Sequence, residues 1–124
     1  DECFVAARLR FDVLADADAD ADVQRIRALL ERRRQTQPIG AWSGGSTFTN
    51  PPGDHAARLI ESAGLKGHRI GGASVSTRHA NFLINEGTAT AADLERLIAH
   101  VQATVAQVHG VRLVPEVRIL GEPA

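Results

Sequence analysis

Residues 43–55 read Ser-Gly-Gly-Ser-Thr-Phe-Thr-Asn-Pro-Pro-Gly-Asp-His, and this stretch decides how the rest of the chain is organised. Glycine has too much backbone freedom, and proline lacks an N–H donor, so these residues can form neither a helix nor a central strand. They predict a shaped loop that presents hydroxyl, amide and backbone N–H groups. A surface connector would have a similar composition, so the loop alone does not establish a binding site.

The residues after this loop predict a helix and a glycine-rich break. Asp54 is expected to cap a helix that carries apolar residues at helical spacing and ends at Gly64. The N-terminus of such a helix offers free N–H groups and positive potential to an anion. Gly71-Gly72 interrupts any long strand between residues 68 and 76 and allows a close approach of backbone. Residues 82–84 are expected to form a short buried strand.

Four further segments complete the predicted architecture. Residues 4–13 alternate between apolar and polar side chains, which predicts a half-buried strand. Residues 22–35 and 90–109 both carry apolar residues at helical spacing, so each is predicted to be an amphipathic helix. In the second, Thr90 and Asp93 are placed for an approximate capping box, and Gly110 ends the helix. Residues 111–120 predict a last strand, which Pro115 restricts to an edge or a bulge.

This order of elements predicts an α+β domain with a small, mostly antiparallel sheet packed by about three helices. The formal net charge of -1 gives no electrostatic footprint for nucleic acid or an anionic membrane. No apolar run approaches the ~18 residues that span a bilayer. The single cysteine, Cys3, excludes an internal disulfide and indicates a reducing, cytoplasmic compartment. The chain has no initiator Met, so we expect a fragment or a processed chain.

Common cofactor and metal motifs are absent from the sequence. It contains neither GxGxxG after a strand nor GxxxxGK[ST]. The aspartates of residues 16–22 resemble a calcium loop, but no frame places Gly at position 6 and Glu at position 12. The histidines show no HExxH spacing and no pairing with cysteine, so no metal site is expected. The candidate catalytic residues that remain are Ser46, in a glycine-flanked loop, and Glu116, in the predicted last strand. A carboxylate such as Glu116 ordinarily forms a solvated ion pair, here with Arg112 or Arg118.

Four segments occur in one order with natural spacing: GGSTFTNPPGDHAARLIESAGLKG, GGASVSTRHANFLIN, TATAADLERLIAHV and PEVRILG. Together they resemble the C-terminal domain of the UDP-N-acetylenolpyruvoylglucosamine reductase (MurB) family. The resemblance covers roughly residues 20–122. It implies that residues 15–124 form the substrate-binding domain of this enzyme, and that residues 1–14 are the tail of a preceding flavin-domain region.

The resemblance also implies a chemistry. In this family NADPH reduces FAD, and the flavin gives hydride to C3 of the enolpyruvyl group of UDP-N-acetylglucosamine enolpyruvate, which yields UDP-N-acetylmuramate for peptidoglycan synthesis. FAD is expected mainly on domains outside this chain. The resemblance assigns to Ser46 the protonation of C2, and to Glu116 the polarisation of the enolpyruvyl carboxylate. An unperturbed serine is a poor acid, so this needs a strongly basic carbanion and a hydroxyl held in line.

Further positions are implied to meet the substrate. Asn50 matches a family position near the substrate, and His79 falls at a polar substrate contact. The diphosphate is implied to approach an arginine, Arg33 or Arg34, and Gln37. Many relatives carry Lys where this chain has Thr49, which removes a possible phosphate contact. The expected partners are the substrate and the FAD-binding domains, with no nucleic acid and no membrane.

One alternative from a different class remains open. The chain could be a non-catalytic module that recognises a sugar nucleotide or another anion through residues 43–55. Substitution of Ser46 would then weaken binding. In an enzyme the same change would leave binding nearly normal and slow the reaction.

Overall fold

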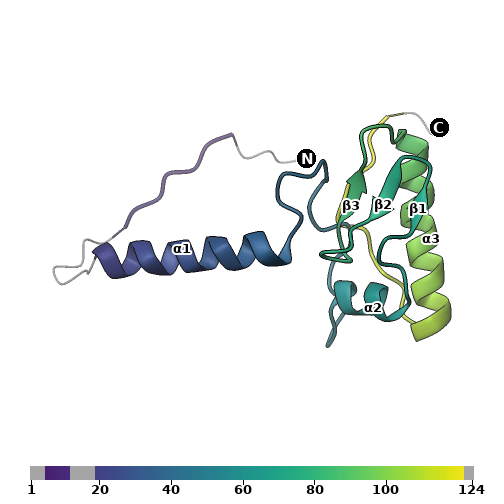
Figure 1. Ribbon diagram of the computed structural model, residues 1–124, viewed down its shortest axis with the longest axis horizontal. Coiled ribbons are helices and arrows are strands. Elements are labelled where there is room, and N and C mark those ends of the chain that lie inside the picture. Colours follow the sequence, from purple (N-terminus) through teal and green to yellow (C-terminus); the bar gives the residue numbers. More distant parts are fainter. Residues whose placement is uncertain (1–4, 12–18, 122–124) are drawn as a thin grey trace.

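The computed structural model describes residues 5–11 and 19–121, and Cys3 and most of the acidic segment lie outside these ranges. Three helices, α1 (Ala19–Thr36), α2 (Ala56–Ser62) and α3 (Ala91–His109), accompany three short strands, β1 (Arg69–Ile70), β2 (Ala73–Val75) and β3 (Leu83–Asn85). The strands form one antiparallel sheet in the order β1-β2-β3 (Figure 1). The predicted α+β class, with its small antiparallel sheet and about three helices, is confirmed.

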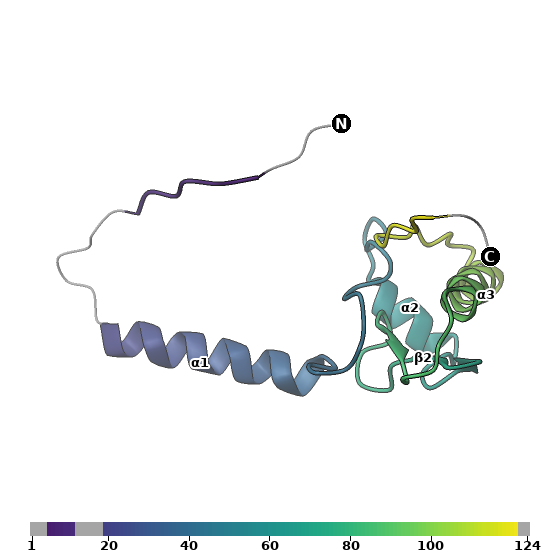
Figure 2. The same cartoon turned by 90° about the horizontal axis from the view of Figure 1, so that it is seen from above.

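The core lies where α2 and the sheet pack against α3. The view in Figure 2 looks nearly along α3 and separates this compact body from α1, which projects away from it. The largest fully buried side chains are Phe48, Leu59, Ile60, Leu97, Leu113, Val75, Val101 and Val105. Phe48 belongs to the polar loop rather than to a helix or strand, so the loop itself contributes to the core. None of the described helices is both long and apolar enough to cross a membrane.

Helix α3 begins and ends as the sequence predicts. The Thr90 hydroxyl accepts from the Asp93 amide at 3.1 Å, and the Asp93 carboxylate accepts from the Thr90 amide at 3.0 Å, which completes a capping box. The bond from the Thr90 amide is the main reason that the pKa of Asp93 falls to about 2. Gly110 closes the helix with a φ of 69°, in the left-handed region.

The Gly71-Gly72 pair forms the turn between β1 and β2 and lies against the start of α3. The Gly72 amide points at the Asp93 carboxylate, 3.4 Å away. A Cβ on Gly72 would overlap the backbone of Thr88 and Ala89, and one on Gly71 would overlap the Asp93 side chain. The close backbone approach predicted for this pair is therefore confirmed, and it holds the turn against the N-terminus of α3.

Both predicted terminal strands are wrong. Residues 5–11 are exposed and lie in no strand, and residues 111–120 make only an isolated bridge between Phe48 and Pro115. A strand is stable only beside a partner. Within the described residues nothing pairs with 5–11, and Pro115 has no N–H for a regular ladder.

The predicted cap of α2 is also wrong. His55, not Asp54, is the N-cap, and it makes no side-chain capping bond. The Asp54 carboxylate instead accepts from the His55 amide at 2.7 Å and forms an ion pair with Arg58. The Ala56 amide, which has no partner within the helix, donates to the Asn50 side-chain oxygen at 3.0 Å. Because Asn50 already supplies an acceptor from the loop, the helix begins one residue later than Asp54 would place it.

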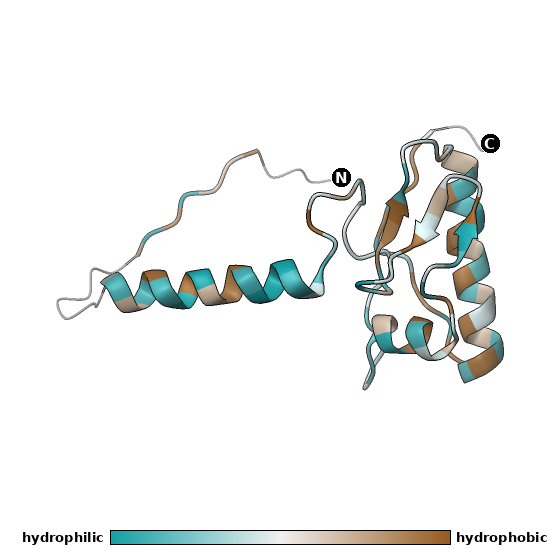
Figure 3. Cartoon of the chain, in the orientation of Figure 1, coloured by the Kyte–Doolittle hydropathy of each residue, from teal (hydrophilic) through white to brown (hydrophobic). Residues whose placement is uncertain are grey.

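Helix α1 forms over 19–36, slightly longer than the predicted 22–35, but its apolar stripe is not covered. Val23, Ile26, Leu29 and Leu30 are 43–60% exposed. Figure 3 shows brown bands along this otherwise hydrophilic helix. Its C-terminal end is tied to the body by Arg78, whose guanidinium donates to the carbonyls of Arg34 at 3.0 Å and Gln37 at 3.3 Å. The amphipathic pattern is therefore confirmed, without the burial that such a pattern normally accompanies.

Replacement of Gly72 by alanine should destabilise the fold. The added Cβ would meet backbone atoms of Thr88 and Ala89, which cannot rotate away, so the β1–β2 turn or the start of α3 must shift. We expect the free energy of unfolding to fall by ~1–3 kcal/mol in a urea titration of the 124-residue chain.

Gly44→Ala is the matched control, because a Cβ there would have its nearest neighbour, Val117 Cγ1, at 3.8 Å. It should leave the unfolding midpoint nearly unchanged. Equal midpoints for the two variants would show that the contact between the turn and α3 does not constrain the fold.

Candidate functional site

A polar cleft of about 250 Å³ opens between the 46–50 loop, the start of α2 and the segment before β3. Four of the side chains singled out in the sequence line it: Ser46, Asn50, His79 and Glu116. These residues come from positions up to 70 apart in the sequence, so only the fold brings them together. The remaining lining residues are Phe48, His55, Ala57 and Asn81.

The loop is held in the body by Asn81. This side chain is only 4% exposed, and its carbonyl oxygen accepts from the Phe48 amide at 3.0 Å. Its amide nitrogen donates to the Phe48 carbonyl at 2.7 Å, while the Asn81 backbone carbonyl accepts from the Thr47 amide at 2.8 Å. Phe48, itself 1% exposed, fixes the loop from the other side through core packing. The loop therefore has a defined conformation although it contains little regular structure.

Glu116 is brought beside Ser46 by backbone contacts of the same loop. The Glu116 amide donates to the Thr47 carbonyl at 2.8 Å, and the Thr49 amide donates to the Val114 carbonyl at 2.9 Å. On its other edge the loop bridges from Ser46 to Phe82. The segment thus lies like an irregular strand between the segment before β3 and the C-terminal segment. Ser46 and Glu116 are both exposed, so both are accessible to a ligand.

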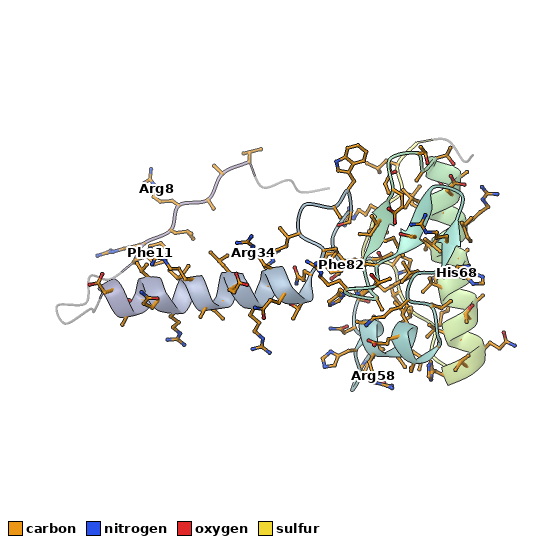
Figure 4. All side chains as sticks on the ribbon, in the orientation of Figure 1. Arg8, Phe11, Arg34, Arg58, His68 and Phe82 are labelled. Atoms are coloured by element: carbon orange, nitrogen blue, oxygen red, sulfur yellow. The ribbon has the colours of Figure 1, made fainter. Side chains whose placement is uncertain are left out.

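The start of α2 does not offer the anion site that its sequence suggests. The amides of His55 and Ala56 are already bound by the side chains of Asp54 and Asn50. The hydrogen bond from the Arg58 side chain is the main reason that the pKa of Asp54 lies far below its usual range, so this carboxylate stays charged. A negative charge at this end of the helix disfavours an anion there. Figure 4 shows Arg58 on the outer side of α2, pointing away from the body.

His79 enters the cleft as a neutral ring. It meets Phe82 edge-on, with ring centroids 4.8 Å apart, and among the described residues its Nδ1 is buried without a hydrogen-bond partner. This burial lowers the pKa of His79 below its ordinary 6.5, because the charged imidazolium would lose water. The ring therefore contributes a hydrogen-bonding group to the cleft without adding a positive charge.

Arg33 and Gln37 lie outside this cleft. The Arg33 guanidinium donates to the Gln37 side chain at 3.0 Å, and both belong to the C-terminal end of α1 or the residue after it. Arg34 lines a separate hollow with Arg78. The structure thus groups four of the expected site residues and leaves these apart, so their contact with a diphosphate stays a prediction. In the described ranges no three His, Cys, Asp or Glu side chains gather in a way that could hold a metal.

Asn81 is the site residue that the sequence analysis missed. It lies two residues after His79 in a stretch that reads as the entry to a buried strand. Its partners lie 33 residues earlier in the chain. A buried asparagine needs hydrogen bonds, but no local pattern says that a backbone so far away supplies them.

Replacement of Asn81 by alanine should loosen the loop. The amide and carbonyl of Phe48 would be buried without partners, so we expect the free energy of unfolding to fall by ~1–3 kcal/mol, measured by urea denaturation. Asn85→Ala also removes two bonds, to the amides of Gly87 and Ala89, but these lie nearer solvent. Its effect should be smaller, and equal losses would contradict the role given to Asn81.

His79 should make stability depend on pH. Because its folded-state pKa is depressed, the unfolded chain takes up a proton that the folded protein disfavours once the pH falls below about 6.5. The stability is therefore complete above that pH and decreases as the pH falls toward the folded-state pKa. We expect the loss of melting temperature between about pH 7 and pH 5 to be smaller in His79→Gln than in the unmodified chain. Identical pH profiles would show that the imidazole is not desolvated.

Comparison with known proteins now assigns the fold and cleft to a family. The model of the "UDP-N-acetylenolpyruvoylglucosamine reductase, C-terminal domain" family matches residues 37–120. A UDP-N-acetylenolpyruvoylglucosamine reductase from Alkalilimnicola ehrlichii is 62% identical over 98% of this chain and 40% of its own length. One from Methylococcus capsulatus is 60% identical over 98% of this chain and 39% of its own length.

A solved structure agrees. The crystal structure of the reductase (MurB) from Thermus caldophilus superposes with a TM-score of 0.61 and 39% sequence identity, over 75% of this chain and 33% of that one. The chain thus spans about 40% of the length of the first of these curated relatives. Since the family model matches most of the chain, including every residue that lines the cleft, the chain belongs to the UDP-N-acetylenolpyruvoylglucosamine reductase family and carries its C-terminal domain.

Proposed function

We propose that this chain is the substrate-binding and proton-donating part of an FAD-dependent, NADPH-using reductase that converts UDP-N-acetylglucosamine enolpyruvate to UDP-N-acetylmuramate. The observation that carries the proposal is the cleft in which Ser46 and Glu116 lie together with Asn50 and His79. The family assignment, the exposure of both catalytic candidates and the rigid hold on the loop all support it. A cytoplasmic location is part of this proposal.

The cleft does not fit FAD. Its volume of about 250 Å³ lies below the usual range of sites for drug-sized ligands, ~300–1,000 Å³. Apart from Phe48 and Ala57 its lining is polar, which does not suit a large flavin ring. It is suited to a small polar group such as the enolpyruvyl end of the substrate. We therefore place FAD on the preceding part of a longer protein, and the roles below belong to this chain alone.

Ser46 is the proposed proton donor. When a hydride adds to C3 of the enolpyruvyl group, the electron pair of the double bond moves to C2 and into the carboxylate. The Ser46 hydroxyl then gives its proton to C2, forming the C–H bond. Because Ser46 is exposed at the cleft, its oxygen can regain a proton from water. A hydroxyl can act in this way because the carbanion at C2 is a far stronger base than a ground-state group.

Glu116 and the two polar neighbours have supporting roles. Glu116 is the proposed group that polarises the enolpyruvyl carboxylate, where negative charge accumulates in the transition state. Asn50 and His79 are placed to bind neutral polar groups of the substrate. The neutral state of His79 matters because a positively charged imidazolium in the cleft would attract the substrate carboxylate away from Glu116.

The non-catalytic alternative receives less support. A module that captures anions through residues 43–55 would use free amides at the start of α2. Two of those amides are bound by Asn50 and Asp54, and the Asp54 carboxylate carries the same charge as the ligand. The polar cleft remains, but it is better suited to hold one reacting group than a diphosphate.

Substitution of Ser46 in a complete reductase tests the proposal. The protein would be the Alkalilimnicola ehrlichii relative in which this chain replaces the 40% of the length that it matches. In Ser46→Ala we expect stopped-flow reoxidation of the reduced flavin by the enolpyruvyl substrate to slow by ~10²–10⁴-fold, the usual contribution of a positioned proton donor. Reduction by NADPH and the substrate dissociation constant should stay nearly unchanged, because the proton is needed only in the transition state.

Ser43→Ala is the matched control, since Ser43 is an exposed serine of the same loop that does not line the cleft. It should keep the unmodified rate. Weakened substrate binding with an unchanged rate in Ser46→Ala would favour the binding-module alternative. An unchanged rate with unchanged binding would remove Ser46 from the mechanism.

A further inference from the structure

The apolar face of α1 is exposed, although its side chains are suited to burial. Val23, Ile26 and Leu30 recur along one side of the helix, with Leu29 beside them, and all four are 43–60% exposed. In proteins most of the stability of a helix comes from packing of its amphipathic face rather than from helix propensity. In Figure 4 the side chains of α1 extend into open space along most of its length.

The segment before α1 has the same character. Residues 5–11 alternate in polarity, and Val5, Leu9 and Phe11 are 96%, 74% and 80% exposed. The compact body buries Phe48, Leu59 and Leu97 in its core. Seven of the thirteen exposed large apolar side chains of the described residues nevertheless lie in the two consecutive segments that precede the body, and the other six are spread over residues 39–120. A group of this size within two adjacent segments points to a covering surface.

The relatives are longer than this chain, which bears on what covers these segments. The family model of the C-terminal domain begins at residue 37, after α1 has ended. The Alkalilimnicola ehrlichii relative nevertheless matches 98% of this chain and is about two and a half times as long, so the similarity extends through α1. Elements consecutive in sequence are usually neighbours in space. The part that precedes a C-terminal domain is therefore the nearest source of a partner for α1.

We propose that the face of α1 formed by Val23, Ile26, Leu29 and Leu30 docks onto the flavin-binding N-terminal part of the longer reductase. This inference rests on the proposed function, which places FAD on that part. The C-terminal end of α1 is fixed to the body, because the Arg78 guanidinium donates to the Arg34 and Gln37 carbonyls there. Helix α1 then acts as an arm that sets the position of the Ser46–Glu116 cleft relative to the flavin.

The test compares charge-matched variants of the two helix faces in the grafted reductase described above. Ile26→Glu/Leu30→Glu places two negative charges on the docking face. Gln24→Glu/Ala28→Glu adds the same charge to the opposite face. We expect amide hydrogen exchange over residues 19–36 to rise by at least about tenfold in the first variant and to stay unchanged in the second, because burial of each aliphatic side chain shifts the opening equilibrium by more than that factor.

The 124-residue chain gives the second comparison. Here α1 is exposed on both faces, so neither pair should change its exchange, and exchange in the unmodified chain should already be faster than in the graft. Equal exchange of α1 in the graft and in the chain alone would overturn the docking. So would equal effects of the two variant pairs. Protection of α1 in the chain alone that grows with its concentration would show that a second copy covers the face instead.

Flavin reoxidation separates this inference from the proposed function. If the unmodified graft protects α1 but does not oxidise its flavin with the enolpyruvyl substrate, the docking holds and the proposed function fails. If the graft turns over while α1 exchanges freely, the docking alone is wrong.

Discussion

The site depends on one hydrogen-bonding group, the buried side chain of Asn81, which bonds both polar backbone groups of Phe48. Residues 43–55 contain too much glycine and proline to organise themselves through regular structure. Their rigidity comes from outside the loop: Asn81 holds the backbone, and the Phe48 ring is packed in the core. A hydroxyl on this loop is thus positioned by hydrogen bonds and core packing that lie outside the loop, and a group that acts only in the transition state requires such positioning.

The same backbone contacts connect the two catalytic candidates. The Thr47 carbonyl accepts from the Glu116 amide, so the residue after Ser46 sets the position of Glu116. Their relative geometry therefore does not rely on a direct contact between two exposed side chains, which solvent and rotamer entropy would weaken. The cleft is open to solvent, because Ser46, Asn50 and Glu116 are all exposed in this chain.

Much of the fold could be predicted, because its signals are local. The capping box of α3, its end at Gly110 and the close approach at Gly71-Gly72 each depend on residues a few positions apart or on the absence of a Cβ. The prediction that Asp54 caps α2 was wrong because Asn50, six residues before Ala56, supplies the acceptor for the Ala56 amide at the start of the helix. The role of Asn81 could not be predicted from periodicity, since its partner is distant in sequence. The grouping of Ser46 with Glu116 came from the family resemblance, not from any spacing.

The strand predicted at residues 4–13 failed for a different reason, and α1 shares it. Alternation or helical periodicity shows which side chains are suited to burial, but not what buries them. Along most of α3 the pattern and the observed burial agree, as Leu97, Val101 and Val105 show. In residues 5–11 and in α1 they disagree, although the periodicity is as clear. In α1 the side chains are suited to burial and are nevertheless exposed, which supports the docking proposed for this helix; both segments precede the domain that the family model delimits.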